Sequence, residues 1–482
     1  MLIIAANIKN SSLVARERAA GELVYFEDND NDIVKRLGVI ASSYDLTAHN
    51  SQRLECYLVF NDSTSLWLLQ TIGLTKEIVE KVDVFATTME DLLAKAVFLK
   101  LPNCQSPLPP LDRMPITYNS ESTVHLVIIG FSSLSESLAI NASLVAHYPN
   151  YCRDVKLRTR ITIIDDNIYD GKDKLTQRYV HLFDNSYYRT IDLSDANPQC
   201  VLHRPKYEHK RKDFVDIEWE FVNGNVRNEA VRQKLAEWST DVSQQLTIAI
   251  CHNDQENNYT EAFSLPLDVY NNNVPILCYS DQSDIIRMTS AESTYSSIHP
   301  FGRNLCDIRI LRILKHLAQR VNYVYNHCFS LAPCDPITAP SIIDEEKLDM
   351  QWRNVGSLPK QYSNIFNAMT LATKMHSIGH TSDDWQEYYA LTLDEIKILT
   401  EVEHNRWNVE ELILGYRPTT DEEQKLIEND IAQKKVLRNK KIHYDLRAFD
   451  DLRSDSTGKN VNVYDMALTQ GIPLIIKSCI SD

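Results

Sequence analysis

Short apolar runs alternate with helical patterns over the first 115 residues. The runs LVYF (24–27), CYLVF (56–60) and VDVFA (82–86) each have the length and composition of a β-strand. Between and after them, TSLWLLQTIG and MEDLLAKAVFL carry apolar residues at spacings of three and four, which predicts helices. Five prolines within PNCQSPLPPLDRMP (102–115) then predict a domain boundary, because proline neither continues a helix nor donates to a sheet. Residues 1–115 are thus predicted to form an α/β domain.

The second block, residues 120–300, contains apolar runs that are too continuous for strands buried on one face only. These runs are VHLVIIGF (124–131), RITIIDD (160–166), LTIAICHND (246–254) and VPILCYS (274–280). The first leads directly into a helical pattern, and each ends where polar residues begin. Strands buried on both faces are typical of parallel sheets. We therefore predict a Rossmann-like α/β domain with a doubly wound, mainly parallel sheet, in which ligands bind beyond the carboxyl ends of the strands.

The rest of the chain is predicted to be mostly α-helical. From LCDIRILRILKHLAQRVNYVYNHCF onward, apolar residues recur at three-and-four spacing for about 25 residues. We divide this part into a helical connector (301–380) and a C-terminal domain (381–482). The stretch 198–216, which interrupts the preceding α/β pattern, carries a basic run that we interpret as a solvated insertion in preference to a phosphate site.

Composition narrows the function classes. The chain of 482 residues is 43% hydrophobic and 24% charged, which indicates a folded protein, and its net charge of −16 disfavours nucleic-acid binding. The ten cysteines form no CxxC pair and no Cys/His cluster at zinc spacing, so we expect reduced thiols and no metal site. No export signal and no membrane span is visible. These features predict a cytoplasmic protein that does not contact membranes.

The turn after the strand 124–131 stands where a dinucleotide fingerprint would lie. Gly130, Ser132 and Ser135 occupy the three glycine places of GxGxxG, with Ser133 between them. Glycines there let backbone N–H groups at a helix N-terminus approach a pyrophosphate, whereas a Cβ at the second place crowds that approach. The sequence leaves open whether nucleotide binding is retained, altered or lost.

Four more polar residues would face the same crevice. Asp165 and Asp166 end the next strand, where an acidic residue accepts from a ribose hydroxyl, although a strand-end aspartate is also a common helix cap. His252 and Asp254 end a further strand, and their alternative interpretation is a polar turn. The expected cofactor is NAD(P) or another adenine nucleotide.

Two resemblances to known families rest on these and later motifs. HLVIIGFSSLSESLA, RITIIDD, LTIAICHNDQENNYTEAFSLP and VPILCYS resemble the nucleotide-binding domains of the TrkA-N (RCK-type) family. Residues 55–98 echo the same pattern, so a degenerate extra Rossmann-like unit and an unrelated α/β half-domain both stay open for the N-terminus. The resemblance implies nucleotide-dependent regulation of an attached partner, and a homodimer.

The C-terminal part resembles the ryanodine-receptor repeat, or RyR domain, of bacterial proteins. VEHNRWNVEELILGYRP (402–418), NKKIHYDLRAFDDL (439–452) and VYDMAL (463–468) occur in the expected order, with an insertion between Arg417 and Lys440 as a departure. The ligand residues that this resemblance implies are Glu403, His404, Arg406, Trp407, Tyr416, Arg417, Lys441 and His443. It also implies a sensor of nucleotide derivatives in bacterial signalling or anti-phage defence.

The residues support a pocket without the family name. His404 and Trp407 lie three apart on a predicted helix and so share a face. An aromatic plane flanked by Arg406, Arg417 and His443 suits a purine that carries a phosphate. The alternative is that Trp407 anchors a core and the arginines pair with nearby glutamates.

No enzyme signature is visible, neither a GxxxxGK[ST] loop nor HExxH nor GxSxG. We therefore expect a non-catalytic sensor or regulator that binds a nucleotide-like small molecule, with a protein effector as a further partner. Two alternatives remain: an NAD(P)-dependent oxidoreductase, and an interaction scaffold with a degenerate nucleotide site.

Overall fold

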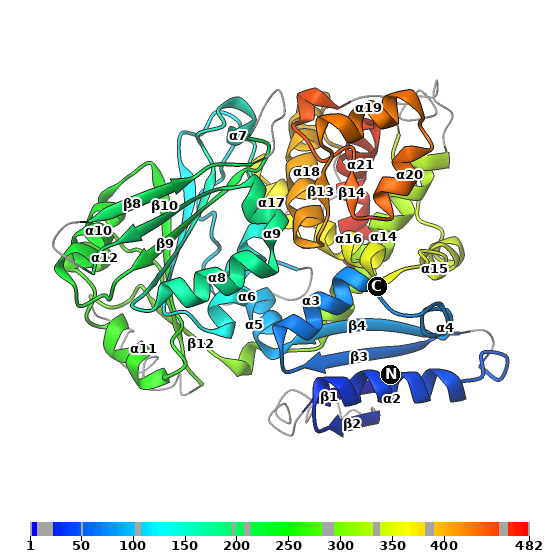
Figure 1. Cartoon of the computed structure of the whole chain (residues 1–482), viewed down its shortest axis with the longest axis horizontal. Helices are drawn as coiled ribbons and strands as arrows, with labels where there is room; N and C mark the ends of the chain where they lie inside the picture. The colour runs from blue at the N-terminus through cyan, green and yellow to red at the C-terminus, as the bar shows by residue number, and fades with distance from the viewer. Residues whose placement is uncertain are drawn as a thin grey trace.

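A computed structural model of the chain describes residues 2–6, 23–49, 52–101, 108–194, 198–206, 213–281, 294–330, 338–380, 390–452 and 461–480. Figure 1 shows three parts that pack on one another: a small N-terminal sheet, a large central sheet and a C-terminal group of helices. The expected basic run at 207–212 lies outside the described residues.

The N-terminal part is a four-stranded parallel sheet in the order β2-β1-β3-β4. Its strands are β1 (Leu2–Ala6), β2 (Leu23–Glu27), β3 (Leu54–Phe60) and β4 (Val82–Thr88). Its helices are α2 (Asp30–Ser43), α3 (Ser63–Ile72), α4 (Lys76–Lys81) and α5 (Met89–Phe98). The three predicted strands are confirmed, and the prediction missed β1, a wholly buried strand in the middle of the sheet.

The central part is an eight-stranded sheet in the order β12-β11-β10-β5-β6-β9-β7-β8. Its strands are β5 (Thr123–Ile129), β6 (Thr159–Asp165), β7 (Tyr187–Asp192), β8 (Gln199–His203), β9 (Ile217–Asn223), β10 (Gln244–Ile250), β11 (Ile276–Tyr279) and β12 (Ile298–Phe301). Every pairing is parallel except that of β7 with β8. Read from β9 to β12, six strands follow the order 3-2-1-4-5-6 of a doubly wound sheet, which confirms the predicted α/β class.

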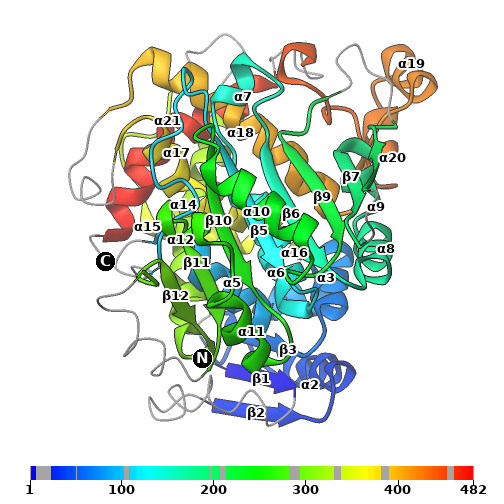
Figure 2. The ribbon, with the colours of Figure 1, turned by 90° about the vertical axis from the view of Figure 1, so that its left-hand side faces the viewer.

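Helices cover both faces of the central sheet. On one face lie α6 (Ser133–Val145), α8 (Ile168–Arg178) and α9 (Val180–Asn185). On the other lie α10 (Glu229–Thr240) and α12 (Leu267–Asn271), which Figure 2 shows in front of the strands, with α11 (Gln255–Ala262) near one end. The strand β8 comes from the interrupting stretch, and its side chains are largely exposed, in keeping with an insertion at the sheet edge.

The C-terminal part is helical, as predicted. Its long helices are α14 (Arg309–Ser330), α16 (Leu358–Met369), α18 (Leu393–Ile413) and α21 (Asn462–Ile480). Its shorter elements are α15 (Glu345–Arg353), α17 (Leu371–Ser377), α19 (Asp421–Asn429), α20 (Gln433–Arg438), β13 (Arg417–Pro418) and β14 (Ile442–His443). The short helix α7 (Asn150–Arg153), which belongs to the central part, packs on α18. Since α14 and α16 pack on α21 and α18, the predicted connector and C-terminal domain form one helical body.

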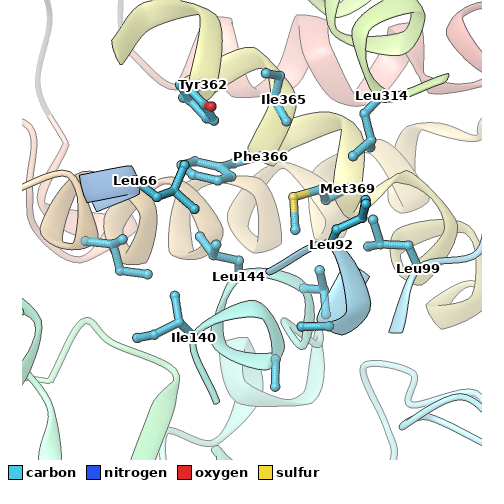
Figure 3. Packing of buried hydrophobic residues seen from close by; sticks show 14 of the residues in the cluster. Leu66, Leu92, Leu99, Ile140, Leu144, Leu314, Tyr362, Ile365, Phe366 and Met369 are labelled. Carbon is cyan, nitrogen blue, oxygen red and sulfur yellow. The ribbon is translucent and has the colours of Figure 1, made fainter. Parts of the chain in front are cut away.

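One apolar core joins the three parts. Figure 3 shows where Leu66 of α3 and Leu92 of α5 meet Ile140 and Leu144 of α6, with Phe366 of α16 above them. Helix α6 is buried along nearly its whole length, because it packs on the central sheet on one side and on α5, α16 and α18 on the other. The parts of the fold that carry the two candidate sites therefore share one hydrophobic core.

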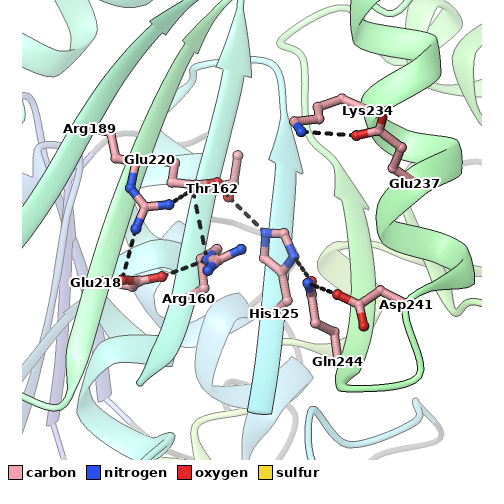
Figure 4. Close-up of polar contacts among 10 residues, drawn as sticks. All are labelled: His125, Arg160, Thr162, Arg189, Glu218, Glu220, Lys234, Glu237, Asp241 and Gln244. Carbon is pink, nitrogen blue, oxygen red and sulfur yellow. Dashed lines mark hydrogen bonds and ion pairs between the residues drawn. The ribbon is translucent and has the colours of Figure 1, made fainter. Parts of the chain in front are cut away.

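Charged residues are also buried on the central sheet, where neighbouring strands neutralise them. Figure 4 shows Arg160 of β6 and Arg189 of β7 bound to Glu218 and Glu220 of β9. The Arg160 Nε to Glu218 Oε1 distance is 2.6 Å, and the Arg189 Nη1 to Glu220 Oε1 distance is 2.7 Å. Burial lowers the pKa of the adjacent His125 to about 3, so this imidazole is neutral. In this network the arginines and glutamates neutralise one another, so we assign it a structural role in the sheet.

Candidate functional site

The eight residues predicted for the Rossmann-like domain gather at the carboxyl edge of the central sheet, and we call them the sheet-edge site: Gly130, Ser132, Ser133, Ser135, Asp165, Asp166, His252 and Asp254. Gly130 has a φ of +89°, a conformation that favours glycine. A Cβ at this position would lie 2.6 Å from Nδ1 of His252. The imidazole therefore packs directly against the tight turn at the first glycine place of the fingerprint.

The serine hydroxyls of the sheet-edge site bind the protein itself. Ser132 begins α6, where its Oγ accepts from the Ser135 N–H at 3.2 Å and donates to the Cys251 carbonyl at 2.7 Å. Ser135 donates to the Gly130 carbonyl at 2.6 Å, while Ser133 is exposed. Both buried hydroxyls thus tie the turn to β5 and β10.

The acidic residues and His252 also have partners within the chain. The Asp165 carboxylate accepts from the backbone N–H of Phe131 at 2.7 Å and of Asn167 at 2.8 Å. Asp254 caps α11, and Asp166 is exposed. The hydrogen bond from His252 Nε2 to Glu261, 2.7 Å long, raises the pKa of His252. Asp165 thus binds the backbone of two turns and is not the cap of α8, whose N-cap is Asn167, while Asp254 lies in a polar turn and caps α11.

The second candidate site is a cavity of about 970 Å³ among the C-terminal helices, which we call the helical pocket. Side chains of α14, α16, α18, α20 and α21 line it, with residues of α3 and β14 at its margin. Seven of the eight residues predicted for the C-terminal domain line it: Glu403, His404, Arg406, Trp407, Tyr416, Lys441 and His443. The eighth, Arg417, lies outside the lining and binds Glu423 through both of its terminal nitrogens at 2.7 and 2.8 Å.

Glu403 organises the buried wall of the helical pocket. Its carboxylate accepts from Asn367 Nδ2 at 2.7 Å, from Arg406 Nη2 at 2.8 Å, and from the Lys374 ammonium. Burial alone would raise the pKa of Glu403, but the two cations hold it at about 2. The group is therefore ionised at neutral pH and fixes the three helices α16, α17 and α18 to one another.

The expected role of Arg406 as a phosphate ligand needs correction. The guanidinium is almost fully buried, and it binds Glu403 and, four residues further along the helix, Glu410. A cation held by two carboxylates has little charge left to attract a ligand anion. Arg406 is therefore a structural residue in the wall of the pocket. This agrees with the alternative that the arginines pair with nearby glutamates.

Aromatic rings form one side of the helical pocket. Trp407 lies 5.6 Å from the His404 ring and 4.9 Å from the His443 ring, and the Tyr416 ring lies 6.0 Å from that of His443. Burial lowers the pKa of His443 to about 3, so this ring is neutral and adds no charge for a phosphate. We call Trp407, Tyr416 and His443 the first aromatic group.

His404 is held in one orientation. Its Nε2 donates to the Arg447 carbonyl at 2.9 Å, and its Nδ1 faces the Asp465 carboxylate at 3.3 Å. Burial opposes protonation, but the hydrogen bond to Asp465 raises the pKa of His404 above its ordinary value. This pair joins α18 to α21 across the pocket.

Three of the cations that line the helical pocket were missed by the sequence prediction. Lys434, Lys435 and Arg438 of α20 line the cavity beside the predicted Lys441, whose ammonium lies 4.2 Å from the centre of the Tyr416 ring. All three belong to the insertion that departs from the resembled family. The basic sequence QKKVLRNKK was the available signal, because lysine and arginine at helical spacing next to an aromatic motif favour anion binding.

Comparisons with known proteins give no family: no family model, no curated protein and no solved structure matches the chain. Within the described ranges, no group of three His, Cys, Asp or Glu side chains is arranged to hold a metal ion. None of the helices that the structure describes is long and apolar enough to cross a bilayer.

Proposed function

We propose that this chain is a non-catalytic sensor that binds a nucleotide or a nucleotide-derived small molecule in the helical pocket. The observation that carries the proposal is the pocket itself, which combines an aromatic wall with a cluster of lysine and arginine side chains. Aromatic rings stack on any base, and cations bind phosphate oxygens. The volume of about 970 Å³ lies within the range of small-molecule sites.

A ligand in this pocket would contact several helices at once. The lining comes from α14, α16, α18, α20 and α21, and α16 and α18 pack in turn on α3 or α6. A bound molecule that contacts all of them would stabilise one arrangement of the helices and of the sheets behind them. A regulatory role follows from this arrangement, and the TrkA-N and RyR resemblances support it, including a place in bacterial signalling or anti-phage defence. A homodimer and a protein effector stay predictions of those resemblances.

An interaction scaffold is the second candidate function, and the sheet-edge site favours it. There the imidazole of His252 covers Gly130, and Asp165 is bound by two backbone N–H groups. In this proposal the central sheet is doubly wound, but the residues at its nucleotide crevice stabilise the fold and bind no nucleotide.

The test is a thermal-shift panel followed by calorimetry on the full chain. The probes are NAD, NADH, NADP, ATP, ADP-ribose, S-adenosylmethionine and cyclic dinucleotides. A ligand at 100 times its dissociation constant stabilises the folded state by about 2.7 kcal/mol, which a melt detects. A selective shift supports the sensor, whereas a flat panel on protein shown to be free of co-purified ligand supports the scaffold.

Trp407→Ala assigns any shift to the helical pocket. The ring is only partly buried, so its removal is expected to abolish binding and leave a cooperative melt. Trp407→Phe is the matched control, because a phenyl ring still stacks on a base. Global unfolding of the alanine variant would instead support the core interpretation of Trp407.

A further inference from the structure

The helical pocket has a second aromatic group, on a different wall from the first: Tyr325 and Phe329 of α14 and Tyr464 of α21. The ring of Tyr464 lies 5.3 Å from that of Tyr325 and 6.2 Å from that of Phe329, with interplanar angles of 32° and 27°. The Phe329 and Tyr464 rings are stacked and the Tyr325 ring is tilted against Tyr464, so the three rings form one aromatic cluster on the pocket lining.

Exposure distinguishes this second aromatic group from core residues. Phe329 is 64% exposed and Tyr325 is 37% exposed, although both line the cavity. An aromatic ring in a hydrophobic core is covered by the fold, whereas these rings keep apolar surface available at the pocket. A bound molecule with a flat apolar face would cover it.

The two aromatic groups lie next to one another through shared contacts. Asp465 follows Tyr464 on α21 and faces His404, which stacks against Trp407 of the first aromatic group. Arg438 is near both groups. It lines the helical pocket together with Tyr325 of the second group and Tyr416 of the first. The pocket lining thus holds an exposed guanidinium in addition to the two aromatic groups.

We infer that the helical pocket is built for a dinucleotide, a molecule with two aromatic bases joined by a phosphate-bearing link. One base stacks on the first aromatic group, the other on the second aromatic group, and Arg438 with Lys435 and Lys441 binds the link, whereas Lys434 is paired with Asp445 at 2.9 Å. The cavity of about 970 Å³ is at the upper end of the range for small-molecule sites, which is more room than one base and one phosphate require. This inference rests on the proposed function and names its ligand class.

The experiment compares matched probes by isothermal titration calorimetry on the full chain. The pairs are AMP against diadenosine diphosphate and cyclic di-AMP, and GMP against cyclic di-GMP, with NAD as a mixed dinucleotide. Each is titrated into the unaltered chain and into Phe329→Ala, Tyr325→Ala and Tyr464→Ala. Tyr118→Ala is the matched control, since Tyr118 is 38% exposed and is not among the residues that line the pocket.

The expected result is that one two-base probe binds at least about tenfold more tightly than its mononucleotide, the effect of stacking one more base. The variants of the second aromatic group should remove this advantage and leave mononucleotide affinity unchanged, while Tyr118→Ala changes neither. The dinucleotide assignment would be overturned if mononucleotides and two-base probes bound with equal affinity, or if the variants of the second aromatic group had no effect. In either case the proposed sensor function would remain. No binding of any probe would overturn both proposals.

Discussion

The sheet-edge site and the helical pocket were both predicted to bind a nucleotide, yet the structure uses their residues in different ways. At the sheet-edge site, Asp165, Ser132 and Ser135 form short hydrogen bonds to the backbone at the ends of β5 and β10. In the helical pocket, buried ion pairs build a wall in front of which aromatic rings and cations face open space. A polar motif in the sequence therefore predicts where a site lies. It does not predict whether each polar group binds a ligand or another residue of the protein.

The N-terminus of α6 adds to this difference. A helix N-terminus attracts phosphate because its backbone N–H groups carry partial positive charge. In the first turn of α6, Glu136 already supplies a negative charge, and it binds Arg178 of α8. Arg178 also donates to the hydroxyls of Ser63 and Thr64 on α3, both at 2.7 Å. The negative charge in the first turn of α6 thus takes part in contacts between the parts of the fold.

Glu403→Gln is expected to have the largest effect, because it removes the charge that two buried cations share. Leaving Lys374 and Arg406 without this carboxylate should lower the free energy of unfolding by about 3–5 kcal/mol at pH 7. Glu237→Gln is the control, since its exposed pair with Lys234 should contribute less than about 1 kcal/mol. Urea unfolding measures both.

The pH dependence of Glu403→Gln tests the cause. The folded-state pKa of Glu403 is about 2, below an unfolded value of about 4.3, so its stabilisation is present above pH 4.3 and is lost as the pH falls toward 2. The stability gap between the unaltered chain and the variant should therefore narrow as the pH is lowered from 7 to 3.5. A constant gap would show that packing, and not the charge, is responsible.

Gly130→Ala addresses the filled turn of the sheet-edge site. A Cβ at φ +89° and 2.6 Å from the His252 ring should destabilise the fold by about 2–3 kcal/mol, through backbone strain and overpacking. Gly38→Ala is a matched control, because nothing lies within 4 Å of its Cβ position within α2, and alanine there should stabilise by about 0.5–1 kcal/mol. A neutral Gly130→Ala would show that the His252 ring moves aside easily, as a ligand would require.

Asp165→Ala separates a structural from a ribose-binding role. The change leaves the Phe131 and Asn167 N–H groups without their acceptor, so the free energy of unfolding should fall by about 1–2 kcal/mol with no ligand present. Asp166→Ala, at the exposed neighbour, should change stability by less than about 0.5 kcal/mol. A stable Asp165→Ala variant that loses affinity only for ligands with free ribose hydroxyls would restore the predicted role.

The sequence predicted the elements that hydrophobic pattern alone determines. The buried runs at 124–131, 160–166, 246–254 and 274–280 became four parallel strands, and the three-and-four spacing after residue 305 became α14. The strand β9 was missed, although IEWEFVN alternates apolar and acidic residues, because buried glutamates are acceptable only where another strand supplies arginine. Their pairing with Arg160 and Arg189 depends on strand order, which the pattern does not contain.

The helical pocket shows the same limit. Seven lining residues follow from a motif resemblance. Tyr325 and Phe329 of the second aromatic group come instead from a segment about 80 residues upstream, and the cations of α20 come from an insertion. Only the packing of α14 on α21, and of α20 on β14, brings them to the cavity. The prediction that Arg406 binds a phosphate was wrong for a related reason. Its partners Glu403 and Glu410 lie three and four residues away on α18, a spacing that is also common on exposed helix surfaces. Only the burial of these ion pairs shows that Arg406 is not available to a ligand.

Arg438→Gln should have the smallest effect, and it tests what the helical pocket offers that the sheet-edge site does not. The side chain is exposed, so the stability of the fold should change by less than about 0.5 kcal/mol. The affinity for a phosphate-bearing probe should fall severalfold at low salt, and this loss should shrink as added salt screens the charge over about 8–10 Å. Lys397→Gln, a cation of α18 that is not among the lining residues, is the control and should leave affinity unchanged. An Arg438→Gln variant with unaltered affinity at every salt concentration would mean that Arg438 does not contact the ligand. The positive charge that distinguishes the helical pocket from the sheet-edge site would then have no role in ligand binding.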